Sequence, residues 1–292
     1  MNHVLVTGAT GFIGRRLVTE LCRQSLSVRA FVRDTGRAGI LGGDGVSLHE
    51  GRVEDSSSML GLCAGIDTVF HLAGYAHADA ASKDASDLHR KITVVGTRGL
   101  LGEAIRQRVK RFVLVSSVKA QGEDTVRCID EDAPSLPTTD YGRSRFEAEC
   151  LVLAAGREAG LETCVLRLPL VYGPGQKGNL LRMMEAIDRG RFPPLPDTGN
   201  QRSLVHVDDV VQALVLAATQ DAAVGKTYYV TDNRPYTTTD LYRMMRRALG
   251  RPEPRWLLPL GTLRLLARMG DLGQSVFRRR FGFDSEALKK LT

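Results

Sequence analysis

Long apolar runs are missing from this chain of 292 residues. No stretch of about 18 uncharged apolar residues occurs, so the sequence excludes a membrane-spanning helix. A strand-like run begins at Met1 and leaves no length for a signal peptide, which leads us to expect a cytoplasmic protein. Internal repeats and low-complexity linkers are also absent. With 43% hydrophobic and 25% charged residues, the composition is typical of a globular fold.

Cysteine is scarce, and its pattern predicts neither disulfides nor metal binding. The chain has five cysteines, an odd number, and none forms a CxxC pair. We therefore expect reduced, mostly buried thiols in a cytoplasmic protein. No His, Cys and Asp grouping has the spacing of a metal site, and no Gly-x-Ser-x-Gly motif is present. The sequence therefore predicts no metal centre and no hydrolase nucleophile of that type.

Positive charge is concentrated near the C-terminus. Residues 234–292 hold 13 of the 40 basic residues but only 5 of the 33 acidic ones, so their net charge is +8 and that of the remainder is −1. A basic lobe suits a diphosphate substrate or an anionic membrane surface, and without interleaved aromatic residues we expect no nucleic-acid partner. The leucine-rich stretch Trp256–Met269 predicts a helix packed on this lobe, with peripheral membrane contact or a homodimer contact as the alternatives.

Short apolar runs alternate with helical patterns through the first half of the chain. Such alternation predicts an α/β fold, namely a Rossmann-type doubly wound parallel sheet with a smaller C-terminal substrate-binding lobe. We expect the Rossmann domain over 1–167 and the lobe, intertwined with it, over 168–292. The predicted strands are 4–6, 28–32, 46–48, 68–71, 112–115, 163–166, 204–207 and 227–230. The predicted helices are 12–24, 55–63, 87–107, 141–159, 180–190, 208–219 and 238–249.

A glycine-rich turn follows the first strand and opens the first helix. Its spacing is GxxGxxG, within the segment TGATGFIG. Glycines let the backbone turn tightly and approach a pyrophosphate, while the helix N-terminus presents unpaired N–H groups. The turn therefore predicts a dinucleotide-binding site made of Gly8, Thr10, Gly11, Phe12, Ile13 and Gly14.

Several further segments extend this motif into a family resemblance. They are HLAG at 71–74, Tyr141 with a basic residue four positions later, LRLPLVYGPG at 166–175 and RSLVHVDD at 202–209. With TGATGFIG, they resemble the extended short-chain dehydrogenase/reductase family, in its nucleotide-sugar epimerase and reductase branch. The resemblance implies further cofactor contacts at Val53, Asp55, Leu72, Ala73, Gly74, Tyr141 and Arg145. Asp55 has the alternative role of a helix cap.

The end of the second strand bears on which cofactor is bound. An acidic side chain there favours NAD, whereas an arginine accommodates the 2′-phosphate of NADP. Here Val32 occupies the usual position of the acid, and Arg33 follows it with Arg37 nearby. We therefore expect NADP, with NAD as the alternative because Asp34 lies near the distance expected for the acid.

The resemblance also implies the catalytic residues. Tyr141 would exchange a proton with a substrate oxygen, Ser117 would orient that oxygen, and Arg145 stands where the family carries lysine. Arg145 keeps the positive charge but not the compact ammonium group. We expect His71 to order backbone and not to move protons. Val118 and Lys119 replace the acid pair of sugar dehydratases, which argues against dehydration.

The lobe residues implied to bind substrate are Asn179, Leu180 and Arg202, with a helix cap and a surface ion pair as alternatives for the first and last. These residues together predict an NAD(P)-dependent oxidoreductase or epimerase acting on a nucleotide-linked sugar, by 4-keto reduction or C4 epimerisation. The alternatives are a catalytically weak NADP-binding scaffold or sensor, and a reductase of a non-sugar ketone.

Overall fold

The computed structural model describes residues 1–36, 38–41, 43–75, 85–123, 128–176, 178–194, 196–254, 257–277 and 288. The chain forms two compact units, one of residues 1–173 with 205–231 and the other of residues 174–204 with 232–292. The sequence led us to place one boundary between residues 167 and 168. In the structure the stretch 205–231 belongs to the first unit, because its strand β9 (Lys226–Tyr229) pairs with the edge strand β6 (Glu162–Leu168) and its helix α6 (Val207–Thr219) packs on the face of the sheet.

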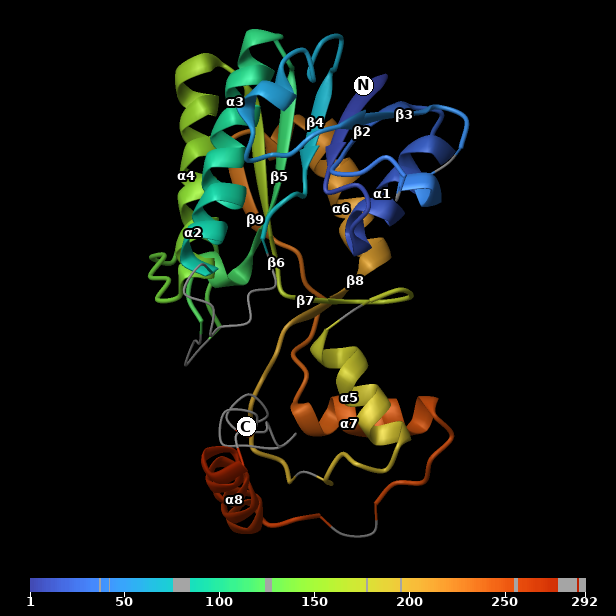
Figure 1. Cartoon of the computed structure of the whole chain (residues 1–292), viewed down its shortest axis with the longest axis vertical. Coiled ribbons are helices and arrows are strands. Elements are labelled where there is room, and N and C mark those ends of the chain that lie inside the picture. Colours follow the sequence, from blue (N-terminus) through green and yellow to red (C-terminus); the bar gives the residue numbers. More distant parts are fainter. Residues whose placement is uncertain are drawn as a thin grey trace. The chain divides into compact units, whose positions relative to one another are not determined.

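A seven-stranded sheet forms the centre of the first unit (Figure 1). Its strand order is β3-β2-β1-β4-β5-β6-β9, and every neighbouring pair is parallel. This arrangement confirms the predicted doubly wound α/β fold, in which ligands bind at the carboxyl ends of the strands where the order reverses, here between β1 and β4. The strands are β1 (His3–Thr7), β2 (Ser27–Val32), β3 (Val46–Glu50), β4 (Thr68–His71), β5 (Arg111–Ser117), β6 (Glu162–Leu168) and β9 (Lys226–Tyr229), and a separate pair is β7 (Leu170–Tyr172) with β8 (Leu204–His206).

Helices cover both faces of this sheet. Figure 1 shows α3 and α4 on one face, and α1 and α6 on the other. The α-helices of the first unit are α1 (Phe12–Arg23), α2 (Ala85–His89), α3 (Gly96–Arg106), α4 (Asp140–Ala159) and α6 (Val207–Thr219), and the helices of the second unit are α5 (Asn179–Asp188), α7 (Thr238–Ala248) and α8 (Leu260–Phe277). Short helical segments are η1 (Ala38–Leu41), η2 (Ser56–Met59), η4 (Val118–Ala120), η5 (Asp221–Ala223) and the π-helical η3 (Arg90–Val95).

The sequence misjudged two of these helices. The helix expected over 55–63 is wrong, because only η2 forms there and left-handed glycines at Gly61 and Gly65 end any continuation. The helix expected over 87–107 is present, but a π-helical turn, η3, separates α2 from α3. π-helical turns are frequent at functional sites because they rotate the side chains that follow.

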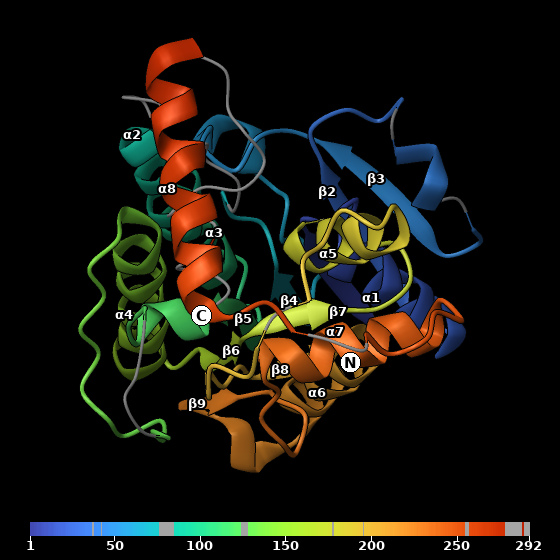
Figure 2. The ribbon, with the colours of Figure 1, turned by 90° about the horizontal axis from the view of Figure 1, so that it is seen from below.

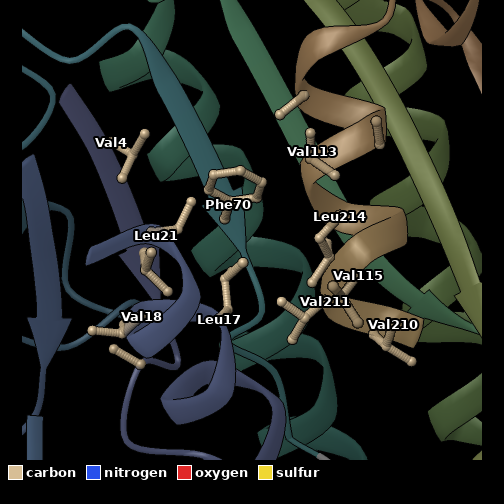
Figure 3. Packing of buried hydrophobic residues seen from close by; sticks show 14 of the residues in the cluster. Val4, Leu17, Val18, Leu21, Phe70, Val113, Val115, Val210, Val211 and Leu214 are labelled. Atoms are coloured by element: carbon tan, nitrogen blue, oxygen red, sulfur yellow. The ribbon is translucent and has the colours of Figure 1, made fainter. Parts of the chain in front are cut away.

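The apolar core on the α1 and α6 face joins residues far apart in sequence (Figure 3). Burying each such side chain stabilises the fold by roughly 1.5–3 kcal/mol. A second core fills the opposite face, so strands of the sheet are covered on both sides. Together the two cores fix the carboxyl edge on which the candidate site lies. In the first core, labelled side chains of α1 and α6 meet those of the strands: Leu17, Val18, Leu21, Val210, Val211, Leu214, Val4, Phe70, Val113 and Val115.

The regular elements described in the second unit are mainly the helices α5, α7 and α8. α5 and α7 lie side by side (Figure 2), and the ring of Phe192 stacks on that of Tyr242 at 5.6 Å between centroids. The helix expected over Trp256–Met269 corresponds to α8, in which Leu263 is fully buried beside Phe192, while Trp256 lies outside the described residues. Among the residues that the structure describes, no helix is long and apolar enough to cross a membrane.

The cysteines are less buried than the sequence led us to expect. All five are free thiols. Cys63 and Cys164 are buried, and burial raises the pKa of the Cys63 thiol to about 12. Cys128 and Cys150 are exposed, because Cys150 lies on the outward face of α4 and Cys128 lies in the loop before that helix. The expectation of mostly buried thiols is therefore wrong.

Candidate active site

The glycine-rich turn joins β1 to α1 through close backbone contacts. Gly8 has a left-handed φ of 69°, and the N–H of Gly11 donates to the carbonyl oxygen of Gly8 at 2.9 Å. A Cβ atom on Gly14 would come within 2.2 Å of that same oxygen. Gly11 caps α1 without a side-chain hydrogen bond, and the first turn of the helix holds no acidic residue. These features leave the helix N-terminus accessible to an anion.

The turn lies directly against the segment that follows β4. A Cβ atom on Gly8 would be 2.9 Å from the carbonyl carbon of Leu72 and from the nitrogen of Ala73. The hydroxyl of Thr7 accepts a hydrogen bond from the Ala73 N–H at 3.2 Å. The structure therefore brings together two of the predicted cofactor segments, TGATGFIG and HLAG, at the carboxyl edge of neighbouring strands.

His71 orders this edge, as the sequence led us to expect. Its imidazole is fully buried, and its two ring nitrogens lie 2.7 Å from the hydroxyl of Thr7 and 2.9 Å from that of Thr97. Burial, with the nearby charge of Arg145, lowers the pKa of His71 to about 3. The ring is therefore neutral at ordinary pH and links β1, β4 and α3, which confirms its structural role.

Arg145 and Tyr141 project from the first turns of α4 towards the same edge. The guanidinium carbon of Arg145 lies 5.3 Å from the centre of the Tyr141 ring, within range of a cation–π contact. Arg145 is 6% exposed, and its Nη1 donates to the carbonyl oxygen of Val115 on β5 at 3.2 Å. Its Nε has no hydrogen-bond partner. The guanidinium charge is thus held beside the ring of Tyr141.

Gly74 makes room for this arginine. A Cβ atom at residue 74 would lie 2.6–2.8 Å from the guanidinium atoms of Arg145, closer than atoms approach without displacement. The backbone of the HLAG segment and the guanidinium group are thus in direct contact. A continuous row of contacts now runs from Gly8 through Leu72 and Gly74 to Arg145 and Tyr141.

Ser117 is the last residue of β5, and it is almost fully buried. Its side chain is 9% exposed, and its hydroxyl oxygen accepts a hydrogen bond from the Lys119 N–H at 3.2 Å as a cap of η4. A Cβ atom on Gly142 would come within 2.5 Å of the Lys119 carbonyl oxygen. The glycine next to Tyr141 therefore lets α4 pack tightly against the turn that follows Ser117.

Glu123 fixes the start of α4. Its carboxylate accepts hydrogen bonds from the backbone and the hydroxyl groups of Thr138 and Thr139, at 2.6–3.2 Å. Thr139 in turn caps the helix by accepting from the Gly142 N–H. Burial acts to raise the pKa of Glu123, but these hydrogen bonds outweigh it and lower the pKa to about 2. The charged carboxylate is thus part of what positions Tyr141.

A buried ion pair holds α4 further along its length. Glu149 accepts from the guanidinium of Arg167 on β6 at 2.8 Å, with 2% and 6% of these side chains exposed. Ser116 on β5 donates to the same carboxylate, and Arg167 also donates to Gln121. The pair with its hydrogen bonds fixes the helix against two strands.

The predicted adenosine-side residues have mixed surroundings. Val53 is buried. Its backbone packs closely on Gly96, where an added Cβ atom would lie 3.0 Å from the carbonyl oxygen of Val53. Asp55 accepts from the N–H and hydroxyl of Ser57, so it caps η2 in the alternative role. Arg33 is exposed directly after β2, and Arg37 lies outside the described residues. The cofactor contacts of these residues stay predictions.

The predicted substrate residues lie in the second unit. Asn179 is exposed and is the first residue of α5, with Gly178 as the cap, so the helix-cap alternative for Asn179 is wrong. Leu180 is half-buried. Arg202 is also half-buried and pairs through its backbone with Tyr236, at 2.8 and 2.9 Å. Their contacts with a substrate stay predictions.

The hydrogen-bond donors of the first unit fit a nicotinamide dinucleotide. The glycine turn offers backbone N–H groups to a diphosphate, and the buried, unpartnered Nε of Arg145 needs an acceptor such as a ribose hydroxyl. In the described ranges, no group of His, Cys, Asp or Glu side chains could hold a metal ion.

Sequence reasoning missed several residues that shape this site. Thr7 and Thr97 hold His71, Gly142 lets α4 approach, and His89 contacts the ring of Tyr141. A hydroxyl directly before the glycine turn was a usable signal for Thr7. Nothing in the local pattern around His89 distinguishes it from a surface histidine at the end of a helix.

Known proteins resemble this chain in sequence and in structure. The model of the NAD dependent epimerase/dehydratase family matches residues 4–231. The UDP-glucose 4-epimerase of Vibrio cholerae is 32% identical over 265 residues, which cover 89% of this chain and 79% of that protein. The 4-hydroxy-2-methyl-3-oxo-4-farnesyl-3,4-dihydroquinoline-1-oxide ketoreductase of Stigmatella aurantiaca is 29% identical, over 92% of this chain and 80% of that protein.

The chain is also similar over most of its length to a solved structure of MoeE5 in complex with UDP-glucuronic acid and NAD. Its TM-score is 0.73 at 30% sequence identity, and the match covers 86% of this chain and 84% of MoeE5. The family match spans the glycine turn, Ser117, Tyr141 and Arg145. The chain therefore belongs to the NAD-dependent epimerase/dehydratase family, within the extended short-chain dehydrogenase/reductases.

Proposed function

We propose that the chain is an oxidoreductase acting on a nucleotide-linked sugar, reducing a 4-keto group or epimerising C4, with NADP preferred over NAD. The observation that carries the proposal is the placement of Tyr141 beside the buried cation of Arg145, in contact with the segment that touches the glycine turn. Two similar proteins support the substrate class, since their names and complexes include UDP-glucose and UDP-glucuronic acid.

The chain's own residues divide the chemistry between them. When bound, a nicotinamide supplies hydride to carbon or accepts it from carbon. In reduction, the Tyr141 hydroxyl gives its proton to the substrate oxygen, and Ser117 donates a hydrogen bond to the same oxygen. The phenolate left on Tyr141 is stabilised by the charge of Arg145. In epimerisation, Tyr141 first removes the hydroxyl proton and later returns it.

The cofactor preference rests on the end of β2. Val32 is buried there and carries no charge, while Arg33 is exposed and suits a 2′-phosphate. The NAD bound to MoeE5 supports the alternative. An NADP preference favours net reduction, because an epimerase regenerates its cofactor and gains nothing from a reduced pool.

A non-sugar ketone is the second candidate substrate. The ketoreductase of Stigmatella aurantiaca, whose name describes a farnesyl-substituted ring ketone, favours it. The role of Tyr141 would be the same, but Asn179 and Arg202 would have no diphosphate to bind.

A panel of substrates tests the proposal. Purified protein with NADPH or NADH is mixed with a UDP-4-keto sugar or with an apolar cyclic ketone, and nicotinamide absorbance is followed. In a second arm, UDP-glucose is incubated with the protein and NAD, and the sugar is analysed for the C4 epimer. Oxidation of NADPH by the keto sugar, or formation of the epimer, supports the proposal. Turnover of the apolar ketone alone would replace it with the second candidate, and turnover with neither would favour the NADP-binding scaffold.

A further inference from the structure

The imidazole of His89 lies between two tyrosine rings at the candidate active site. His89 is the last residue of α2, immediately before the π-helical turn η3, and its side chain is only 6% exposed. Its ring centre lies 5.0 Å from that of Tyr75 and 5.6 Å from that of Tyr141, at interplanar angles of 71° and 64°. Edge-to-face packing of this kind favours a defined ring orientation.

Two different groups contact the ring of Tyr141. His89 packs on this ring, and the guanidinium of Arg145 lies 5.3 Å from its centre. Arg145 is anchored to β5 through Val115, and His89 is anchored by a hydrogen bond with the backbone of Tyr75. Each contact restricts the rotation of the phenol ring, and proton transfer depends strongly on that orientation.

The protonation state of His89 affects the site because charged side chains lie near its ring. Arg145 and Asp140 of α4 are the charged neighbours, and Tyr141 of α4 and Tyr75 are the titratable rings that pack on it. Burial is the main cause that lowers the pKa of His89, and the charge of Arg145 adds to it; together they outweigh the hydrogen bond with the Tyr75 backbone and the charge of Asp140, which act to raise it. Nδ1 of the ring is buried without a hydrogen-bond partner, so a proton added there would place a second cation near Arg145.

We propose that His89 is a positioning residue for Tyr141, holding its ring through an uncharged aromatic contact supported by Tyr75. The proposal rests on the function proposed above for Tyr141 and assigns a role to a buried imidazole that this chemistry does not otherwise use. An aromatic ring is needed for the contact, and a neutral imidazole adds no second positive charge beside the guanidinium of Arg145. Protonation of His89 in acid would repel Arg145 and displace the ring that both of them hold.

Activity of paired variants tests the contact, with UDP-glucose and NAD as the probe. His89→Ala should lower kcat about tenfold and leave the KM for UDP-glucose and the Kd for NAD within about twofold, because only ring orientation is lost. His89→Phe keeps an aromatic edge and should restore kcat to within about twofold of the native protein. His49→Ala, which removes an imidazole packed on Phe31 in the same unit, should leave kcat unchanged. In a Tyr141→Phe background, His89→Ala should have no further effect.

A spectroscopic measurement tests the same contact without turnover. The chain has seven tyrosines, so the protein is labelled with 13C at tyrosine Cζ, and the Tyr141 signal is identified as the one lost in Tyr141→Phe. Between about pH 8 and pH 5, where histidine protonation is accessible, the Tyr141 signal should shift in the native protein and stay constant in His89→Phe.

The two measurements separate failure of this proposal from failure of the proposed function. Absence of turnover both with UDP-glucose and NAD and with a UDP-4-keto sugar and NADPH, together with a His89-dependent shift of the Tyr141 signal, would reject the function but keep the contact. Full activity in a folded His89→Ala protein would overturn the positioning role. Loss of activity in His89→Phe equal to that in His89→Ala would also overturn it, because the imidazole nitrogen and not the ring contact would then be needed.

Discussion

At the scale of single residues, Arg145 and Gly74 are matched to each other. The guanidinium group occupies the space that a side chain at residue 74 would fill. We predict that Gly74→Ala lowers kcat by about tenfold in the native protein, because the added methyl group displaces Arg145 from Tyr141. In an Arg145→Lys protein, whose shorter head leaves this space free, Gly74→Ala should cost less than about threefold. Steady-state kinetics of the four proteins measures this coupling.

The control is Gly102→Ala on α3, where an added Cβ atom would meet nothing within 4 Å. That variant should keep native kinetics. Equal losses from Gly74→Ala in both backgrounds would show that residue 74 does not act through Arg145. We also predict that Arg145→Lys raises kcat or leaves it unchanged, while Tyr141→Phe is nearly inactive but still binds cofactor.

Arg33 provides the second prediction at this scale. It is exposed directly after β2, where we expect the cofactor's adenosine ribose to bind. Arg33→Ala should weaken NADPH binding by about 1–3 kcal/mol, through loss of a charged hydrogen bond, and leave NADH binding nearly unchanged. Fluorescence titration of both nucleotides measures the difference, with Arg15→Ala on α1 as a control that should preserve the ratio. Tighter binding of NADH than NADPH by the native protein would reverse the cofactor preference.

Sequence patterns reached only part of the site at this scale. Tyr141, Arg145 and the glycine turn could be predicted because each belongs to a local motif with fixed spacing. Glu123 and His89 could not, because their partners Thr138 and Tyr75 lie 15 and 14 positions away in the sequence. Nor does the one-letter code indicate that Gly142 is needed for close packing against Lys119.

At the scale of elements, α4 owes its position to a buried ion pair with β6. Removing the charge of Glu149 leaves the guanidinium of Arg167 without a counter-charge in the core. We predict that Glu149→Gln lowers the free energy of unfolding by about 3 kcal/mol. Glu20→Gln, which breaks the exposed pair with Arg23, should cost less than about 0.5 kcal/mol. Urea denaturation of both variants measures the contrast, and comparable small losses would show that the Arg167 network does not stabilise the helix.

The elements themselves were largely predictable from the alternation of apolar patterns. Helices that pair an amphipathic pattern with a clear end, such as α4 ending at left-handed Gly160, were located to within a residue or two. The prediction of a helix over 55–63 was wrong because Gly61 and Gly65 adopt left-handed backbone conformations, which apolar spacing does not indicate. The apolar spacing gives no sign of the π-helical turn η3, which in the structure packs against α4.

At the scale of the whole molecule, acid should destabilise the fold in two overlapping steps. The folded pKa of His71 is about 3 against an ordinary 6.5, so its contribution is complete above pH 6.5 and is lost as the pH falls towards 3. The folded pKa of Glu123 is about 2 against 4.5, so its contribution is complete above pH 4.5 and is lost towards 2. Both groups bind protons more readily in the unfolded chain, and stability therefore declines steadily below about pH 6.5.

Denaturation midpoints measured at intervals from about pH 8 to pH 2.5 check this prediction. His71→Gln should reduce the slope of stability against pH above about pH 4.5, where the contribution of Glu123 is constant, while Glu123→Gln should reduce this slope only below that pH. A stability that is constant from about pH 7 to pH 5 would contradict the assignment of His71 as a buried neutral ring.

The return of residues 205–231 to the first unit has a consequence for how the chain acquires its fold during synthesis. A nascent chain that ends at Gly173 lacks β9, so the edge of β6 is unpaired, and it lacks α6, so Leu17 and Val18 of α1 have no cover from Val210 and Val211. The core that supports the glycine-rich turn near the start of the chain is therefore complete only after α6 and β9 have been synthesised. Such late, long-range closure slows folding and exposes sheet edges in the meantime. Truncation anywhere before residue 231 should consequently yield an aggregating fragment and not a smaller dinucleotide-binding domain.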